Sequence, residues 1–306
     1  MNKSSFIKIN PADSVVVCLS PISKGTIINV DNEEIHVLQD TPAGHKILVK
    51  DTPKGTDIIK YGYPIGHALS DLKAGEWINE NNLKTNLEGT LSYKYEPVNE
   101  KLNIEKVNRT FNGYVRKNGE VGIRNEVWIV PTVGCVNGIA EKLSSQLEKE
   151  TGLEGIDAVH AWHHNYGCSQ LSEDHENTRK VLRDIVLHPN AGAVLVVGLG
   201  CENNQPADFE KMLGDYDKER IRFMVAQDVK GNEVEEGMKI LRELYAIAKE
   251  DKRTECPLSE LRVGLKCGGS DGFSGITANP LVGELSDFIV AQGGTSILTE
   301  VPEMFG

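Results

Sequence analysis

The fold is decided by a short apolar stretch near the middle of the chain, Gly192-Ala193-Val194-Leu195-Val196-Val197. Nearly every side chain in it is apolar, so the strand that it predicts must be buried on both faces. Similar β-type runs occur at 127–130, 221–225, 261–265 and 296–299. Strands that are buried on both faces are typical of parallel sheets.

Segments with helical spacing separate these runs. After the first run, the apolar residues Val136, Ile139, Ala140, Leu143 and Leu147 lie three or four positions apart, which predicts a helix with one buried face. Further helices are predicted near 207–213, 234–248 and 279–291. Alternating strands and helices indicate an α/β fold, a mostly parallel open sheet with helices on both faces.

The first part of the chain has a different pattern. Short β-type runs at 15–19, 35–38, 46–49 and 57–61 are separated by turns that contain glycine. This predicts a small N-terminal all-β domain over residues 1–89. Residues 90–110 are polar and without periodicity, which indicates a linker, and the α/β body is expected over 111–306.

Composition narrows the possible partners. The chain has 306 residues and a formal net charge of -12, which argues against binding to a nucleic-acid backbone. No stretch reaches the roughly 20 apolar residues of a membrane span, and no apolar signal core follows the first residues. We therefore expect a cytoplasmic protein with no membrane or nucleic-acid partner. The six cysteines stand in separate segments, which favours reduced thiols or metal ligands.

Polar and metal-binding residue types follow the predicted strands. Because ligands of open α/β sheets bind beyond the carboxyl ends of the strands, these loops predict one site assembled from several segments, and hence an enzyme. The strongest of these clusters follows a strand that ends near His160 and contains His164 and Cys168, whose imidazole and thiolate suit iron, zinc or a similar divalent ion. Cys201 and Cys267 follow later strands, each within a turn that contains glycine. As lone cysteines, all three are also compatible with small buried hydrophobic residues.

Two loops carry groups suited to a polyhydroxylated acid. Glu202-Asn203-Asn204-Gln205 offers a carboxylate and three amides, although a hydrogen-bonded helix cap is an equally good interpretation. The glycine-rich loop that begins at Cys267 adds Ser270 and Asp271, suited to a carboxylate or hydroxyls. It lacks the spacing of nucleotide-binding loops. In the first domain, His45 follows a glycine in a turn, where a functional and a structural role are both open.

Several longer motifs resemble one enzyme family. Gly44-His45-Lys46 and Lys60-Tyr61-Gly62 with Pro64-Ile65-Gly66 resemble the small β-clip (SAF) domain of the altronate and galactarate dehydratases. Four further motifs resemble the body of the same family. They are Pro131-Thr132-Val133-Gly134-Cys135-Val136-Asn137-Gly138-Ile139-Ala140, His164-x-Tyr166-Gly167-Cys168-Ser169-Gln170-Leu171, Gly198-Leu199-Gly200-Cys201-Glu202-Asn203-Asn204-Gln205 and Cys267-Gly268-Gly269-Ser270-Asp271-Gly272. The resemblance covers essentially the whole chain and is closer to the altronate branch.

The resemblance implies a reaction and a set of roles. The reaction is loss of water from D-altronate to give 2-dehydro-3-deoxy-D-gluconate, a step of hexuronate catabolism, with a divalent iron or manganese ion. Our hypothesis assigns the metal to His164, Cys168, Cys201 and Cys267, with His164 and His45 as catalytic residues. It assigns the substrate contacts to Glu202, Asn203, Gln205, Ser270 and Asp271.

Two alternatives stay open at this point. In the first alternative, the substrate is galactarate or another sugar acid. In the second, the chain is an inactive fragment that binds substrate or metal and needs the missing C-terminal region. The second arises because the family continues beyond its Pro-Glu-Met-Phe-Gly segment, which stands here at 302–306, so the α/β body is expected to be truncated at its C-terminus. A homo-oligomer is compatible with the sequence, which leaves the oligomeric state open.

Overall fold

A computed structural model describes residues 4–86, 103–266, 268 and 272–300. The chain divides into two compact units, one formed by Val107–Leu261 and the other by the segments before and after it. None of the described helices is long and apolar enough to cross a membrane.

The Val107–Leu261 unit is built on a four-stranded sheet in the order β13-β12-β14-β15. All three pairings in this sheet are parallel. The strands are β12 (Glu126–Pro131), β13 (Ala158–Ala161), β14 (Ala191–Gly198) and β15 (Ile221–Val225). The apolar stretch at 192–197 lies in β14, a central strand that is buried along nearly its whole length. The predicted parallel sheet is confirmed.

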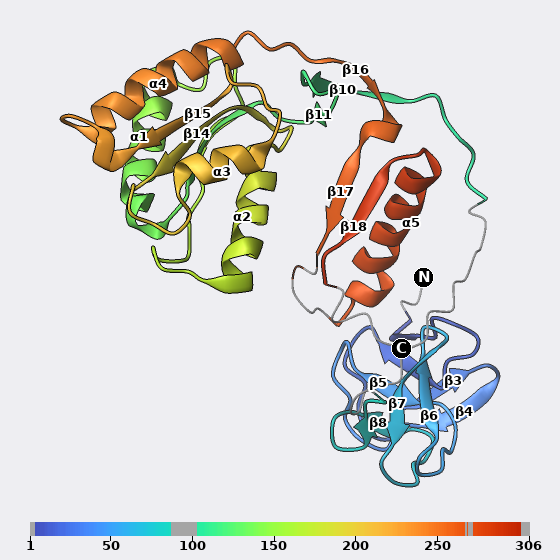
Figure 1. Cartoon of the computed structure of the whole chain (residues 1–306). Coiled ribbons are helices and arrows are strands. Elements are labelled where there is room, and N and C mark those ends of the chain that lie inside the picture. Colours follow the sequence, from blue (N-terminus) through green and yellow to red (C-terminus); the bar gives the residue numbers. More distant parts are fainter. Residues whose placement is uncertain (1–3, 87–102, 267, 269–271, 301–306) are drawn as a thin grey trace. The chain divides into compact units, whose positions relative to one another are not determined.

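Helices cover both faces of this sheet (Figure 1). One face packs against α1 (Asn137–Thr151) and α4 (Glu233–Ala248), and the other against α2 (Ser172–Val186) and α3 (Pro206–Leu213). The sequence pattern did not predict α2. This helix is rich in charged residues and buries only Leu182 and Val186, so its apolar spacing is too sparse to stand out.

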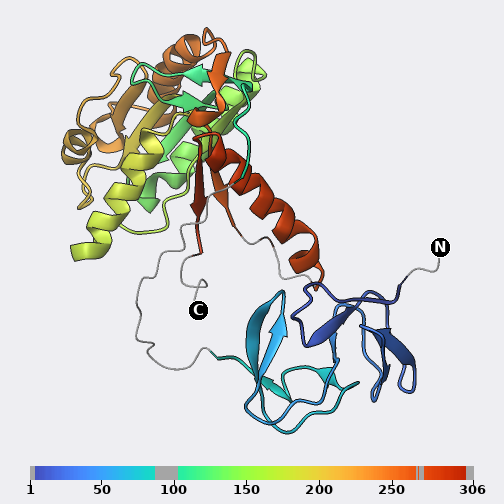
Figure 2. The ribbon, with the colours of Figure 1, turned by 90° about the vertical axis from the view of Figure 1, so that its right-hand side faces the viewer.

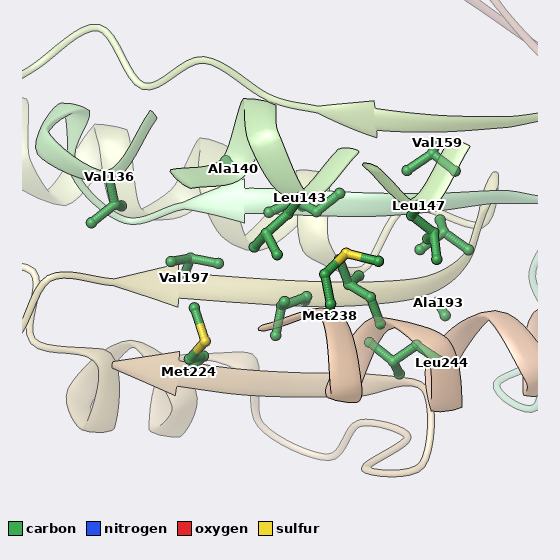
Figure 3. Packing of buried hydrophobic residues seen from close by; sticks show 14 of the residues in the cluster. Val136, Ala140, Leu143, Leu147, Val159, Ala193, Val197, Met224, Met238 and Leu244 are labelled. Atoms are coloured by element: carbon green, nitrogen blue, oxygen red, sulfur yellow. The ribbon is translucent and has the colours of Figure 1, made fainter. Parts of the chain in front are cut away.

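The larger core lies between the sheet and the α1–α4 pair (Figure 3). Leu143 and Leu147 of α1 pack with Met238 and Leu244 of α4 over the strands, and all four side chains are buried. These α1 residues are the helical-spacing positions found in the sequence. Each side chain removed from water in this way contributes about 1.5–3 kcal/mol, which fixes the strands and the loops that follow them.

Short elements complete the unit. An antiparallel sheet in the order β11-β10-β16 was not predicted; its strands are β10 (Thr110–Val115), β11 (Val121–Gly122) and β16 (Thr254–Pro257). Single 3₁₀ turns lie at Gly134–Val136, Ala226–Asp228 and Leu258–Glu260. The first two of these follow strands β12 and β15, at the edge where the predicted site lies.

The last described segment differs from the expectation of one continuous sheet. Its strands β17 (Arg262–Leu265) and β18 (Thr295–Leu298) pair in parallel with each other and with no other described strand. The helix α5 (Ala278–Ala291), which follows a 3₁₀ turn at Ser274–Ile276, lies beside β18 (Figure 2). The elements were predicted correctly but their sheet was not, because an apolar run predicts a strand without naming its neighbour.

The described residues of the N-terminal segment form strands and turns and no helix, as expected for an all-β domain. They form a four-stranded sheet β1-β2-β5-β8, a three-stranded sheet β6-β7-β9 and the hairpin β3-β4. Their bounds are β1 (Phe6–Ile7), β2 (Val15–Cys18), β3 (Ile27–Val30), β4 (Glu33–His36), β5 (Lys46–Leu48), β6 (Asp57–Lys60), β7 (Tyr63–Ala68), β8 (Trp77–Ile78) and β9 (Leu83–Lys84). Most of the linker predicted at 90–110 lies outside the described residues.

Candidate active site

Four loops meet at the carboxyl edge of the parallel sheet. The loop after β12 donates a hydrogen bond from the Gly134 amide to the Tyr166 carbonyl in the loop after β13, at 2.9 Å. The β13 loop accepts another at the Cys168 carbonyl from the Asn203 amide of the β14 loop, at 2.8 Å, and the Gln227 amide of the β15 loop donates to the Leu199 carbonyl at 3.0 Å. The predicted convergence of these loops is therefore seen in the structure.

Glu202 holds the β14 loop in place. Its side chain is 2% exposed. The carboxylate accepts hydrogen bonds from Thr132 Oγ1 at 2.7 Å, the Leu199 amide at 3.0 Å and the Gly200 amide at 2.6 Å. Both carboxylate oxygens are thus occupied by the protein itself, which gives Glu202 a positioning role. Its predicted contact with substrate stays a prediction.

His164 is buried beside this carboxylate, with 7% of its surface exposed. Its Nδ1 lies 3.1 Å from both the carbonyl oxygen and the amide nitrogen of Tyr166. In the tautomer that donates from Nδ1 to this carbonyl, Nε2 carries a lone pair available to a metal ion or a proton. Burial lowers the pKa of His164 below 6.5, and the Tyr166 hydrogen bond and the charge of Glu202 oppose the shift. The imidazole is therefore neutral near neutral pH.

The lowered pKa of His164 predicts a pH-dependent stability in the metal-free protein. Below about pH 6.5 the unfolded chain binds a proton at His164 that the folded chain does not, so stability falls as pH falls through this window. The slope is at most about 1.4 kcal/mol per pH unit. Urea unfolding at several pH values should show it in the parent and not in His164→Gln. The exposed neighbour His163, changed to Gln, is the control; identical pH profiles for parent and His164→Gln would contradict the prediction.

Asn137, at the start of α1, fixes the backbone of His164, and it was not among the residues predicted from the sequence. Its Nδ2 donates to the His164 carbonyl and its Oδ1 accepts from the His164 amide, both at 3.0 Å. Gly134 approaches the same segment so closely that a Cβ there would lie 3.1 Å from the His164 carbonyl oxygen. Both residues belong to the family-like motif that runs from Pro131 to Ala140, which was the available signal in the sequence.

Removing the Asn137 amide should loosen the His164 loop. Asn137→Ala leaves one backbone N–H and one carbonyl of His164 without these partners, and we expect a loss of about 1–3 kcal/mol in the free energy of unfolding. Chemical denaturation measures this loss. Asn165→Ala, at an exposed position in the same loop, should change stability by less than about 0.5 kcal/mol. If the free energy of unfolding of Asn137→Ala equals that of the parent, the two hydrogen bonds do not form.

A small cavity of about 10 Å³ lies between the loops. It brings together four of the predicted site residues, His164, Cys168, Glu202 and Asn203. It also adds residues to which the sequence assigned no specific role, namely Thr132, Gly167, Gln170, His175, Thr178 and Asn204. Cys168 and Asn203 are exposed, so the cavity opens toward solvent beside a thiol and an amide.

Two other predicted residues of the β14 loop do not line this cavity. Cys201 is exposed, with its Sγ 3.7 Å from Gln227 Nε2. Gln205 precedes α3 and donates from Nε2 to the Glu202 carbonyl at 2.6 Å. This contact ties the loop to itself, whereas the Gln205 side chain makes no capping hydrogen bond to α3.

The remaining predicted residues lie elsewhere. Cys267, Ser270 and Asp271 fall outside the described residues. His45 belongs to the N-terminal segment, where its Nδ1 accepts a hydrogen bond from Trp77 Nε1 at 3.2 Å. Because indole nitrogen only donates, the His45 proton must reside on Nε2 when the ring is neutral. The orientation of His45 is thus fixed, and its catalytic role stays a prediction.

The donor atoms at the cavity fit part of a metal site. Among the described residues, no group of three or more His, Cys, Asp or Glu side chains is arranged to hold a metal ion. His164 and Cys168 line the same cavity and offer one imidazole nitrogen and one thiolate, both suited to divalent iron. The structure thus places two of the predicted ligands at one cavity, and their role as metal ligands stays a prediction. Cys267 falls in the part of the chain that the structure does not describe.

Comparison with known proteins accounts for most of the chain. Residues 4–86 match the altronate/galactarate dehydratase SAF domain. Residues 113–249 match the D-galactarate dehydratase/altronate hydrolase second domain, and residues 258–306 match the D-galactarate/altronate dehydratase C-terminal domain. The three matches follow the order of the all-β segment, the parallel sheet and the final segment.

Individual relatives agree with these matches. The chain is 51% identical to altronate dehydratase of Escherichia coli (strain K12) over 302 residues, and 51% identical to that of Bacillus subtilis (strain 168) over 303 residues. These alignments include 98% and 99% of this chain and 61% of each relative. Galactarate dehydratase (L-threo-forming) of E. coli is 31% identical over 324 residues, with 98% of this chain and 60% of the relative covered.

The fold and the site together define an α/β chain with an N-terminal SAF domain and a polar site at the carboxyl edge of its parallel sheet. The chain belongs to the altronate/galactarate dehydratase family. It spans about 61% of the length of the two altronate dehydratases that it matches.

Proposed function

We propose that this chain takes part in the removal of water from D-altronate to give 2-dehydro-3-deoxy-D-gluconate. The observation that carries the proposal is its 51% identity to two altronate dehydratases, against 31% to the galactarate enzyme. The aligned part includes every loop of the candidate site. Galactarate or another sugar acid is the second candidate substrate.

The reaction has simple chemical requirements. A base removes the proton on C2, an acid protonates the hydroxyl on C3 so that it leaves as water, and the resulting enol tautomerises to the ketone. When bound, divalent iron or manganese supplies a Lewis acid for the substrate carboxylate and hydroxyl. We propose His164 and Cys168 as its ligands, with Cys201 and Cys267 as further candidates.

The described residues suit specific parts of this scheme. The neutral imidazole of His164 can accept a proton or a metal ion without first losing a charge. Asn203 is exposed at the cavity and can donate to a hydroxyl or carboxylate. Glu202 and Gln205 hold the loop that presents Asn203. Ser270, Asp271 and His45 complete the proposed set of substrate-binding and acid–base residues.

The substrate assignment is tested by direct turnover. The protein is incubated anaerobically with Fe²⁺ and either D-altronate or D-galactarate, and the 2-keto acid product is measured. Formation from D-altronate at the higher kcat/KM supports the proposal, and preference for D-galactarate would replace it with the second candidate. If this chain converts neither while a longer product of the same reading frame does, the chain is a binding part of the enzyme.

Other expectations from the sequence stay predictions. They are a cytoplasmic location, a possible homo-oligomer, and the lack of nucleic-acid or membrane partners. Size-exclusion chromatography with light scattering measures the oligomeric state directly.

A further inference from the structure

Two buried polar atoms at the candidate site have no hydrogen-bond partner among the described residues. One is Oδ1 of Asn204 and the other is Nε2 of His175. Both residues line the cavity that contains His164 and Cys168. Buried polar atoms are nearly always hydrogen-bonded, because an unpaired one carries a desolvation cost. Two such atoms at one cavity therefore indicate that a hydrogen-bonding molecule binds there.

The amide of Asn204 is oriented so that its acceptor, Oδ1, has no partner among the described residues. The residue is only 6% exposed, and its Nδ2 faces the Thr132 carbonyl at 3.5 Å. Rotating the amide by half a turn would place Oδ1 against this carbonyl, acceptor against acceptor, so the observed orientation is the favourable one. The bound molecule must therefore donate a hydrogen bond to Oδ1 of Asn204.

His175 reaches the cavity from a different element. It lies in the first turn of α2, whereas Asn204 lies in the loop after β14. A neutral imidazole nitrogen either donates or accepts, according to its tautomer. An O–H group can do both, since its hydrogen donates to Asn204 while its oxygen accepts from Nε2–H of His175.

The volume of the cavity limits the size of the molecule that can bind there. A volume of about 10 Å³ is close to the roughly 10–15 Å³ needed for one water molecule. We propose that Asn204 and His175 form a subsite for a single O–H group, filled by a water molecule in the free protein. With a sugar acid bound, one substrate hydroxyl is the alternative source of the same group. This second source rests on the proposed function, whereas the water does not.

The first test counts internal water in the 306-residue protein without substrate. Water-oxygen magnetic relaxation dispersion detects water molecules that stay inside a protein for long periods. Asn204→Leu keeps the branched shape and the number of side-chain heavy atoms and replaces the acceptor with a methyl group, so it should hold one long-lived water fewer than the parent. Asn165→Leu makes the same change at an exposed position and should leave the number unchanged. Equal numbers in the parent and Asn204→Leu overturn the proposal.

A high-resolution crystal structure of the parent decides the matter if Asn204→Leu does not fold. A water within about 3 Å of both Asn204 Oδ1 and His175 Nε2 supports the subsite. A direct bond from either atom to another protein group, or a metal ion in that place, overturns it. Crystals with D-altronate then show whether the O–H group comes from water or from substrate. Failure of the turnover assay would leave the water result intact.

Discussion

Changing His164 to alanine is expected to weaken binding of divalent iron by more than about 100-fold, and Cys168→Ala should do the same. Loss of residues that merely orient a ligand typically costs 10–100-fold in metal affinity, and loss of the ligand itself should cost more. Both residues line one cavity, and the lowered pKa of His164 keeps its imidazole neutral as metal binding requires. Anaerobic titration with Fe²⁺, followed by metal analysis, measures the affinity.

Matched controls separate ligand loss from general damage. His163→Ala removes an exposed imidazole next to His164, and Cys135→Ala removes an exposed thiol that does not line the cavity. Both should bind iron as the parent does. The same titration of Cys201→Ala tests whether Cys201 is a further ligand. If His164→Ala and Cys168→Ala bind iron as tightly as the parent, these two residues are not ligands.

Changing Glu202 to glutamine should lower the free energy of unfolding by about 2–4 kcal/mol. The carboxylate accepts three hydrogen bonds, two of them from the backbone amides of Leu199 and Gly200. A glutamine side chain has only one oxygen, so its NH₂ group would face one of these donors and leave a partly buried N–H unpaired. The remaining bonds would also lose the contribution of the charge.

Urea unfolding measures this loss, with Glu148→Gln on the exposed side of α1 as the control. The control should stay within about 0.5 kcal/mol of the parent. A substrate-binding residue without a structural role would behave differently, because its change would alter KM and leave stability intact. Parent-like stability of Glu202→Gln would therefore favour the original prediction of a substrate contact over the positioning role seen here.

The sequence predicted much of the fold because its signals are local. The apolar run in β14 and the spacing of Leu143 and Leu147 in α1 each follow from burial of one segment. The helix α2 has few apolar residues, so local pattern could not reveal it, and His175 was missed with it. The strands β17 and β18 were predicted, but their separate sheet depends on pairing between segments far apart in the chain.

For the site, the sequence by itself determined the chemical types and their order. His164, Cys168 and the Glu202 loop follow successive strands, and parallel strands bring such loops to one edge. Only the tertiary structure decided what each side chain does there. It buried Glu202, tied the Gln205 side chain to the backbone of its own loop, brought His175 and Asn204 to the cavity, and buried His164 enough to lower its pKa. The physical reason is that burial and hydrogen-bond partners come from segments distant in sequence, and residue type alone does not specify them.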